Sequence, residues 1–139
     1  MRLGATLILA SVAAAAACAT VPIYEPREWN ATVDPRADSG VRATVRAATG
    51  PGQTAVAINM AGATAGGTHP WHIHRGTCAT GGGIVGDANA YPALRPGAGG
   101  GATATAHIAV QLVPGEDYHV NVHRSPEALN EILACGNLR

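Results

Sequence analysis

Three of the six histidines in the chain lie close together, in the segment HPWHIH at residues 69–74. In a β-strand, residues two apart point to the same side, so His72 and His74 would face together while Ile73 points to the core. Their Cα atoms would lie about 6.5 Å apart, and two neutral imidazole nitrogens at that spacing can converge on one ion. An H-x-H pair on a strand is therefore half of a copper or zinc site, although exposed strands also carry such pairs by chance.

The strands that would position these histidines follow an N-terminal segment of different composition. Residues 1–18 combine a positive charge at Arg2, an apolar run from Leu7 and small residues up to Cys18, which is the pattern of an export signal. The small residues before Cys18 resemble the lipobox of bacterial lipoproteins, in which the cysteine is acylated and becomes the mature N-terminus. The alternative is an uncleaved anchor, because residues 3–21 carry no charge and could just span a bilayer core. We therefore expect the body to lie on the periplasmic side of a bacterial membrane, tethered by a lipid or a helix.

Export also predicts the state of the other two cysteines. If Cys18 carries lipid, Cys78 and Cys135 remain as a pair in an oxidising compartment, which indicates one disulfide; two free thiols are the alternative. The bond would close a loop of about 57 residues and stabilise the fold by about 4 kcal/mol in the chain-entropy model. It would also join the loop after His74 to the strand after His123, and so bring the two histidine-bearing regions together.

Alternating polar and apolar residues after the linker predict an all-β fold. Turns that contain Gly or Pro separate the alternating runs, and a short run, GGIVGD, adds an eighth strand to seven clearer ones. The seven are WNATVD, GVRATVRAA, TAVAINM, HIH, ATATAHIAVQL, YHVNVH and ILACGNL. The spacing of these runs is typical of an antiparallel β-sandwich or barrel, and the expected architecture is a Greek-key sandwich of seven or eight strands with one disulfide.

The predicted organisation is a single domain behind the export segment. Residues 1–18 form the signal or anchor, residues 19–28 a linker with two prolines, and residues 29–139 the β-sandwich domain. One short helix is predicted in SPEALNE, where Ser125 is a candidate N-cap and Pro126 occupies the first helical position.

The order of the motifs in this domain resembles the copper/zinc superoxide dismutase family. In that family an H-x-H on one strand and a V-V-H on a later strand bind copper, and a disulfide ends in an L-A-C-G run. The corresponding segments here are HIH at 72–74, VNVH at 120–123 and LACG at 133–136. The match covers about residues 41–138. It also has features of the related chordin-type domains, whose H-I-H and Y-V-N-V-H segments are similar to HIH and YHVNVH. Both relatives are Greek-key β-sandwiches.

The resemblance implies one copper ion with three imidazole ligands and an open position for an exchanging ligand. These ligands are His72, His74 and His123. His69 is a conceivable fourth ligand, with a solvated loop residue as the alternative, because the proline after it restricts its backbone. His107 and His119 are expected to be ordinary residues of polar strand faces.

The chain departs from the family pattern where zinc would bind. In the family, a histidine that bridges copper and zinc and further zinc ligands follow the first cysteine. Between Arg75 and Ala106 this chain has no histidine, its only acid is Asp87, and the bridging position falls near Asn89. We therefore expect copper without zinc.

A second departure concerns the guidance of superoxide. The family's arginine just before L-A-C-G attracts and orients the anion, and Ile132 takes that position here. Arg75 and Arg124 each follow a candidate ligand, and they are the candidate catalytic residues that would guide the anion instead.

Two classes of function are consistent with these residues. The first is an exported, membrane-tethered, copper-only superoxide dismutase. The second is a non-catalytic superoxide dismutase-like module: an accessory subunit of a larger envelope protein complex, or a copper carrier. Nine basic and nine acidic residues balance, so there is no basic footprint for nucleic acid.

Overall fold

The computed structural model describes residues 26–139, so the predicted export signal and Cys18 lie outside the described part. This part forms seven strands and one short 3-10 helix. They are β1 (Arg27–Pro35), β2 (Arg42–Gly50), β3 (Gln53–Ala61), β4 (Trp71–Arg75), η1 (Ala88–Ala90), β5 (Ala102–Ile108), β6 (Tyr118–His123) and β7 (Ile132–Leu138). No helix within residues 26–139 has the length and hydropathy that a bilayer crossing requires.

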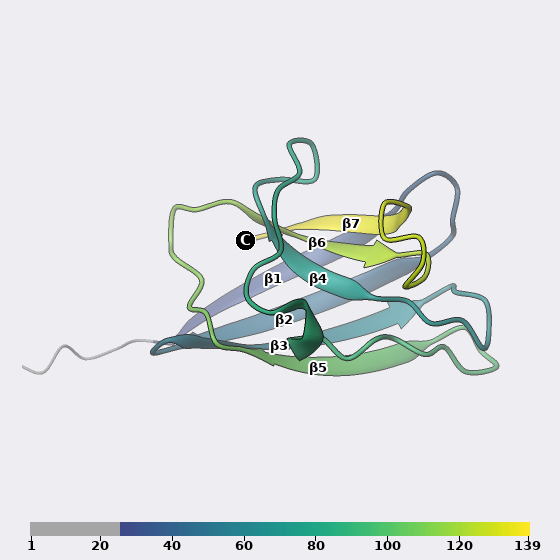
Figure 1. Cartoon of the computed structure of the whole chain (residues 1–139), viewed down its shortest axis with the longest axis horizontal. Helices are drawn as coiled ribbons and strands as arrows, with labels where there is room; N and C mark the ends of the chain where they lie inside the picture. The colour runs from purple at the N-terminus through teal and green to yellow at the C-terminus, as the bar shows by residue number, and fades with distance from the viewer. Residues whose placement is uncertain (1–25) are drawn as a thin grey trace, which may run out of the picture.

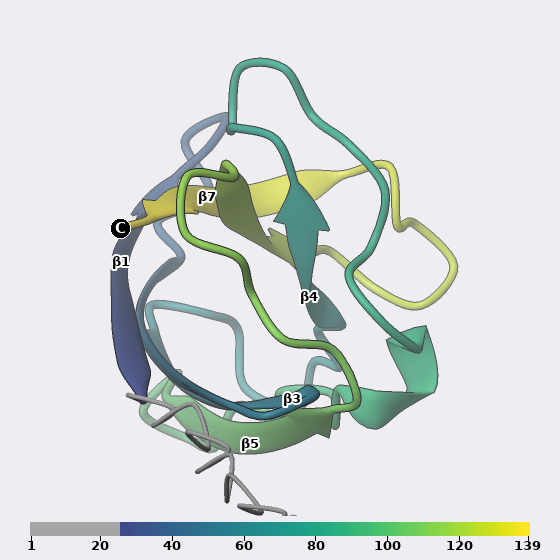
Figure 2. The ribbon, with the colours of Figure 1, turned by 90° about the vertical axis from the view of Figure 1, so that its left-hand side faces the viewer.

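All seven strands belong to one antiparallel sheet in the order β4-β6-β7-β1-β2-β3-β5. The sheet curls, so that β4, β6 and β7 face β2, β3 and β5 across the interior (Figures 1 and 2). The two halves are joined where the end of β1 pairs with β7, through Asp34 with Cys135 and Pro35 with Ala134. The predicted all-β class is confirmed, and the curled sheet is consistent with a β-sandwich or barrel.

Strict alternation of small and medium apolar residues builds the core. Along β2 every second residue from Ala43 to Thr49 is buried while Thr44, Arg46 and Ala48 between them are exposed, and β3 follows the same rule. On β4, Trp71 and Ile73 are fully buried in this interior. Because side chains alternate across a strand, His72 and His74 must leave β4 on the opposite face.

Two predicted elements do not form. GGIVGD contributes only an isolated bridge between Ile84 and His74 and is not a strand. In SPEALNE two successive turns replace the helix, with Ala128 N–H bonded to the Ser125 carbonyl and Glu131 N–H to the Ala128 carbonyl. Seven residues are too few to nucleate a helix on their own. The segment must also reverse direction, because Arg124 N–H bonds to the Glu131 carbonyl just before β7 begins.

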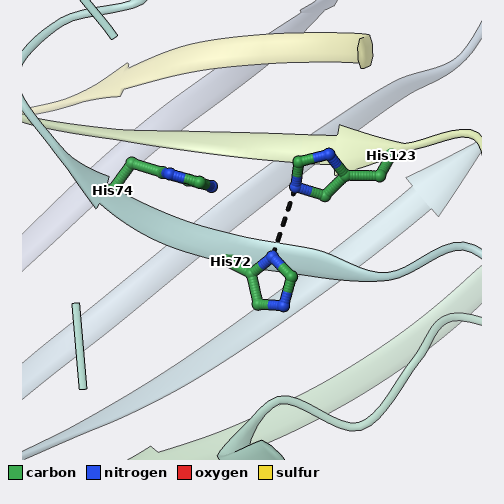
Figure 3. A group of neighbouring side chains, drawn as sticks. All are labelled: His72, His74 and His123. Carbon is green, nitrogen blue, oxygen red and sulfur yellow. Dashed lines mark hydrogen bonds between the residues drawn. The ribbon is translucent and has the colours of Figure 1, made fainter. Parts of the chain in front are cut away.

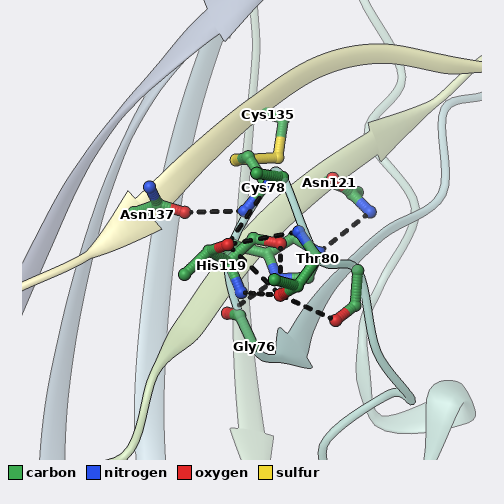
Figure 4. Close-up of a disulfide and its surroundings, with 10 residues drawn as sticks. Gly76, Cys78, Thr80, His119, Asn121, Cys135 and Asn137 are labelled. Carbon is green, nitrogen blue, oxygen red and sulfur yellow. Dashed lines mark hydrogen bonds between the residues drawn. A yellow bond between two sulfur atoms is a disulfide. The ribbon is translucent and has the colours of Figure 1, made fainter.

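The predicted disulfide is confirmed. Cys78 in the loop after β4 is bonded to Cys135 in β7, with 6.0 Å between the Cα atoms (Figure 4). The Asn137 side-chain oxygen also accepts a hydrogen bond of 2.8 Å from the Cys78 backbone N–H. The loop that follows His74 is thus fixed to the last strand at two neighbouring points.

Close contact between β1 and β7 makes Gly136 a sensitive position. A Cβ atom at Gly136 would lie 2.1 Å from the backbone carbonyl oxygen of Thr32, so Gly136→Ala must push the two strands apart. We expect a loss of at least about 2 kcal/mol in the free energy of unfolding, measured by urea denaturation. Gly97→Ala is the control, because a Cβ there meets nothing within 4 Å. Equal stability of the two variants would contradict the contact.

Candidate metal centre

Three histidines from two neighbouring strands converge on one face of the sheet. β4 pairs with β6 so that His72 lies opposite Asn121 and His74 opposite His119. His123 ends β6 next to a register shift against β7. Since His119, Asn121 and His123 follow one another at every second position of the strand, their side chains share the face that carries His72 and His74. Figure 3 shows the imidazoles of His72, His74 and His123 directed toward one another.

The ring nitrogens of these three histidines are close enough to share one ion. One nitrogen of each lies within 4.8 Å of the others. His72 Nδ1 is 3.2 Å from His123 Nε2, the interaction drawn in Figure 3. A metal that holds nitrogen ligands at about 2 Å draws them to within about 4 Å of one another, so small shifts of the rings would let all three bind one ion. The structure thus contains a buried histidine triad that could hold a metal ion.

Backbone carbonyl groups orient two of the three rings. His74 Nδ1–H donates to the Gly82 carbonyl oxygen at 3.0 Å, and His123 Nδ1–H donates to the Leu129 carbonyl oxygen at 2.6 Å. Each bond places the proton on Nδ1 and leaves the lone pair on Nε2, which is how metal-binding histidines are usually held. The Nε2 of His123 accepts from His72 Nδ1. His74 Nε2 is buried and has no hydrogen-bond partner. A buried nitrogen of this kind costs free energy unless a ligand satisfies it, so the residues present fit a metal.

The carbonyl that orients His74 depends on a glycine. Gly82 has φ of 158°, and a Cβ atom there would lie 2.1 Å from the Arg75 backbone oxygen. Only glycine allows the loop to fold back this closely over the end of β4. The glycine run after Cys78 thereby contributes to the site through its backbone.

The triad lies on the outer face of the sheet, but it is covered. His72, His74 and His123 are only 5%, 8% and 4% exposed. The segments that supply Gly82 and Leu129 lie over two of the rings, and the Tyr91 ring packs edge-on against His72 with 5.3 Å between centroids. Burial of the ligands excludes water from the site and strengthens every electrostatic interaction in it.

Burial keeps the three imidazoles neutral. Desolvation, followed by the neighbouring His123 and His74, lowers the pKa of His72 to about 4. Desolvation also lowers the pKa of His74 and of His123, against the opposing effect of their hydrogen bonds to Gly82 and Leu129. A neutral imidazole is the form that binds a metal, so the fold prepares all three nitrogens at neutral pH.

These lowered pKa values predict metal affinity that is insensitive to mild acid. Protons compete with the metal only as the pH falls through the folded pKa, which is about 4 for His72 instead of 6.5. From pH 7.5 to 6 we expect copper affinity, measured against a chelator calibrated at each pH, to change by less than about threefold. The control is a free peptide of residues 69–77, whose ordinary imidazoles should lose more than about tenfold. Parallel losses in protein and peptide would contradict the lowered pKa values.

Two of the three remaining histidines, His69 and His119, are more buried than expected. His69 is 8% exposed and not solvated, and its Nδ1 is 3.2 Å from the His123 backbone oxygen, so it contacts the end of β6. It is not among the three residues whose nitrogens converge.

His119, expected on a polar face, is 1% exposed and stacks on the His74 ring with 5.1 Å between centroids. The covering loop explains this, since the Gly76 carbonyl accepts from His119 Nδ1 at 3.0 Å (Figure 4). His107 is exposed on β5, as expected.

The two candidate guiding arginines differ in their surroundings. Arg124 forms an exposed ion pair with Glu131, which neutralises its charge beside the site. Arg75 is exposed at the end of β4, and strand alternation places it on the face opposite to His74. Their role as catalytic residues remains a prediction.

Two further residues singled out in the sequence, Asp87 and Asn89, lie at the start of η1 and within it. Asp87 caps this short helix by accepting from the Asn89 backbone N–H at 2.9 Å, and both residues are exposed.

Sequence reasoning missed the carbonyl oxygens of Gly82 and Leu129 and the ring of Tyr91. Backbone carbonyls leave no mark in the sequence, and only the glycine run at residues 81–83 indicates a tight loop there.

Comparison of the sequence with protein-family models and with curated proteins finds no match. The assignment of function therefore depends on the geometry of the site.

Proposed function

We propose that His72, His74 and His123 bind one copper ion. The observation that carries this proposal is the buried, partnerless His74 Nε2, held beside a nitrogen of each of the other two histidines. Three neutral imidazoles suit copper or zinc, and at a site of given ligands copper(II) binds more tightly than zinc. The resemblance to copper/zinc superoxide dismutases supports the same choice.

The corresponding activity is dismutation of superoxide. Copper, when bound, would supply one-electron redox chemistry: one superoxide gives up an electron and leaves as O2, and a second takes that electron with two protons and leaves as H2O2. The chain's own contribution is to keep three imidazoles neutral and to orient two of them, His74 and His123, through the Gly82 and Leu129 carbonyls. The N-terminal segment supports a tethered protein on the periplasmic side of a membrane.

A non-catalytic copper-binding module is the second candidate, and the rim of the site favours it. Three of the large apolar side chains that are exposed within residues 26–139 belong to the segments around the triad. They are Ile84, Leu129 and Ile132, at 38%, 47% and 38% exposure. The cation beside His123, Arg124, is already paired with Glu131. A rim of this kind attracts an anion weakly, because guidance needs uncompensated positive charge near the metal.

A copper titration followed by a dismutase assay separates these candidates. The copper proposal requires that the parent bind one equivalent of copper. The His74→Ala variant should bind copper much more weakly, and zinc should compete only weakly for the site of the parent. Dismutase turnover that follows copper occupancy and falls at high ionic strength would support the enzyme. One bound equivalent without turnover would support the binding module, and no stoichiometric binding would refute both.

A further inference from the structure

The outer face of β1, β2, β3 and β7 carries a polar trough that is separate from the histidine triad. A hollow of about 870 Å³ lies over β1, β2 and β7, and none of the three histidines lines it. An adjoining hollow of about 470 Å³ over β1, β2 and β3 shares Thr32, Asp34, Pro35 and Thr44 with the first. The shared residues make the two hollows one continuous depression across strands that lie side by side in Figure 1.

Small residues in the middle of the face and long residues around them create this trough. Thr32 of β1 lies opposite Thr44 of β2, and Thr44 lies opposite Asn59 of β3. Along β2, Arg42 and Arg46 stand two residues before and two residues after Thr44, so their Cα atoms are about 13 Å apart. Both arginines line the trough, one in each hollow.

The trough concentrates positive charge. Its charged lining residues are Arg36, Arg42, Arg46, Arg139 and Asp34. Within residues 26–139 the ion pairs are Arg46 with Glu28 and Arg124 with Glu131. The other three arginines of the trough thus have no carboxylate partner in that part of the chain. Since the whole chain has no net charge, this excess is a local separation of charge.

The residues that line the trough restrict the class of ligand that it can bind. β2 is paired with β1 and β3 along its length, so a peptide cannot add to it as a further strand. Recognition must come from side chains, and arginine binds carboxylates while asparagine and threonine exchange hydrogen bonds with hydroxyl groups. Within the described chain, no aromatic side chain lines either hollow, which disfavours a neutral sugar held by stacking.

We propose that this trough binds an anionic polysaccharide, a linear chain of carboxylated sugars whose charges are met by the three arginines that have no carboxylate partner within the described residues, Arg36, Arg42 and Arg139. The hydroxyl groups of the sugars would meet the row formed by Thr32, Thr44 and Asn59. This binding site is independent of the metal centre and of its chemistry.

The test measures binding of a polygalacturonate oligosaccharide to the full chain in non-ionic detergent, by isothermal titration calorimetry. Arg42→Gln combined with Arg139→Gln should weaken binding by at least about tenfold, because each removes a charge-assisted hydrogen bond. Thr44→Leu keeps every charge but fills the middle of the trough, and it should weaken binding as well. Arg95→Gln is the control for the loss of one charge and is compared with Arg42→Gln alone, since Arg95 lines neither hollow and contacts Thr68.

Three outcomes would overturn the proposal. The first is no binding by the parent, and the second is an equal loss in Arg95→Gln, which would show attraction by net charge alone. The third is equal binding of poly-glutamate, which would show that the trough takes an acidic peptide. Unchanged binding by His74→Ala is expected, because His74 lines neither hollow.

Discussion

Replacing His74 with alanine is expected to lower copper affinity by more than about 100-fold and to abolish stoichiometric binding. The change removes one of three ligands, and even the partners that only orient a ligand are worth about 10- to 100-fold. His74 is 8% exposed and packs against His119, so alanine also leaves a cavity. We expect the free energy of unfolding of the metal-free protein to fall by about 2 kcal/mol, which urea denaturation would measure.

Two controls separate the loss of a ligand from the loss of structure. His107→Ala changes an exposed histidine on β5 and should leave both copper affinity and stability unchanged. His119→Phe keeps a ring stacked on His74 but removes the nitrogens of a buried non-ligand, so copper binding should persist. If His74→Ala bound copper like the parent, or if His119→Phe lost binding to the same extent, the assignment of the triad would be wrong.

Opening the disulfide is expected to destabilise the domain and to weaken the metal site together. Cys78 and Cys135 are 57 residues apart, and releasing a loop of that length costs about 4 kcal/mol in the chain-entropy model. The same loop carries the Gly76 and Gly82 carbonyls that accept from His119 and His74. Reduction therefore frees the groups that orient a ligand, and copper affinity should fall by about 10-fold or more.

The measurement uses a Cys18→Ser background, in which the only remaining cysteines are Cys78 and Cys135. Urea denaturation and copper titration are compared for the oxidised protein and for Cys78→Ser with Cys135→Ser. Asn137→Ala is the matched control: it removes the 2.8 Å bond to the Cys78 backbone but leaves the disulfide closed. A double variant as stable as the oxidised protein, or with unchanged copper affinity, would contradict the coupling.

Sequence alone determined the features that follow from local periodicity. Alternation along segments such as GVRATVRAA predicted strands whose buried and exposed residues the structure confirms. The same period of two placed His72 and His74 on one face of β4, because a strand leaves its side chains no other choice. Cysteine count and the expected compartment predicted the disulfide between Cys78 and Cys135.

Only the tertiary structure decided what covers that face. From the sequence, the histidine-bearing face of β4 and β6 was predicted to be polar and solvated. In the structure, loops cover this face and leave His119 only 1% exposed. Those loops also supply the carbonyl oxygens of Gly82 and Leu129, which fix the protonated nitrogens of His74 and His123. A loop's path depends on contacts between residues far apart in the chain, and every residue has a carbonyl, so no residue type marks the ones that orient a ligand. The predicted helix in SPEALNE does not form for the same reason. The hydrogen bond between Arg124 and Glu131 turns the chain into β7, and this long-range constraint outweighs the weak helix-capping preference of the segment.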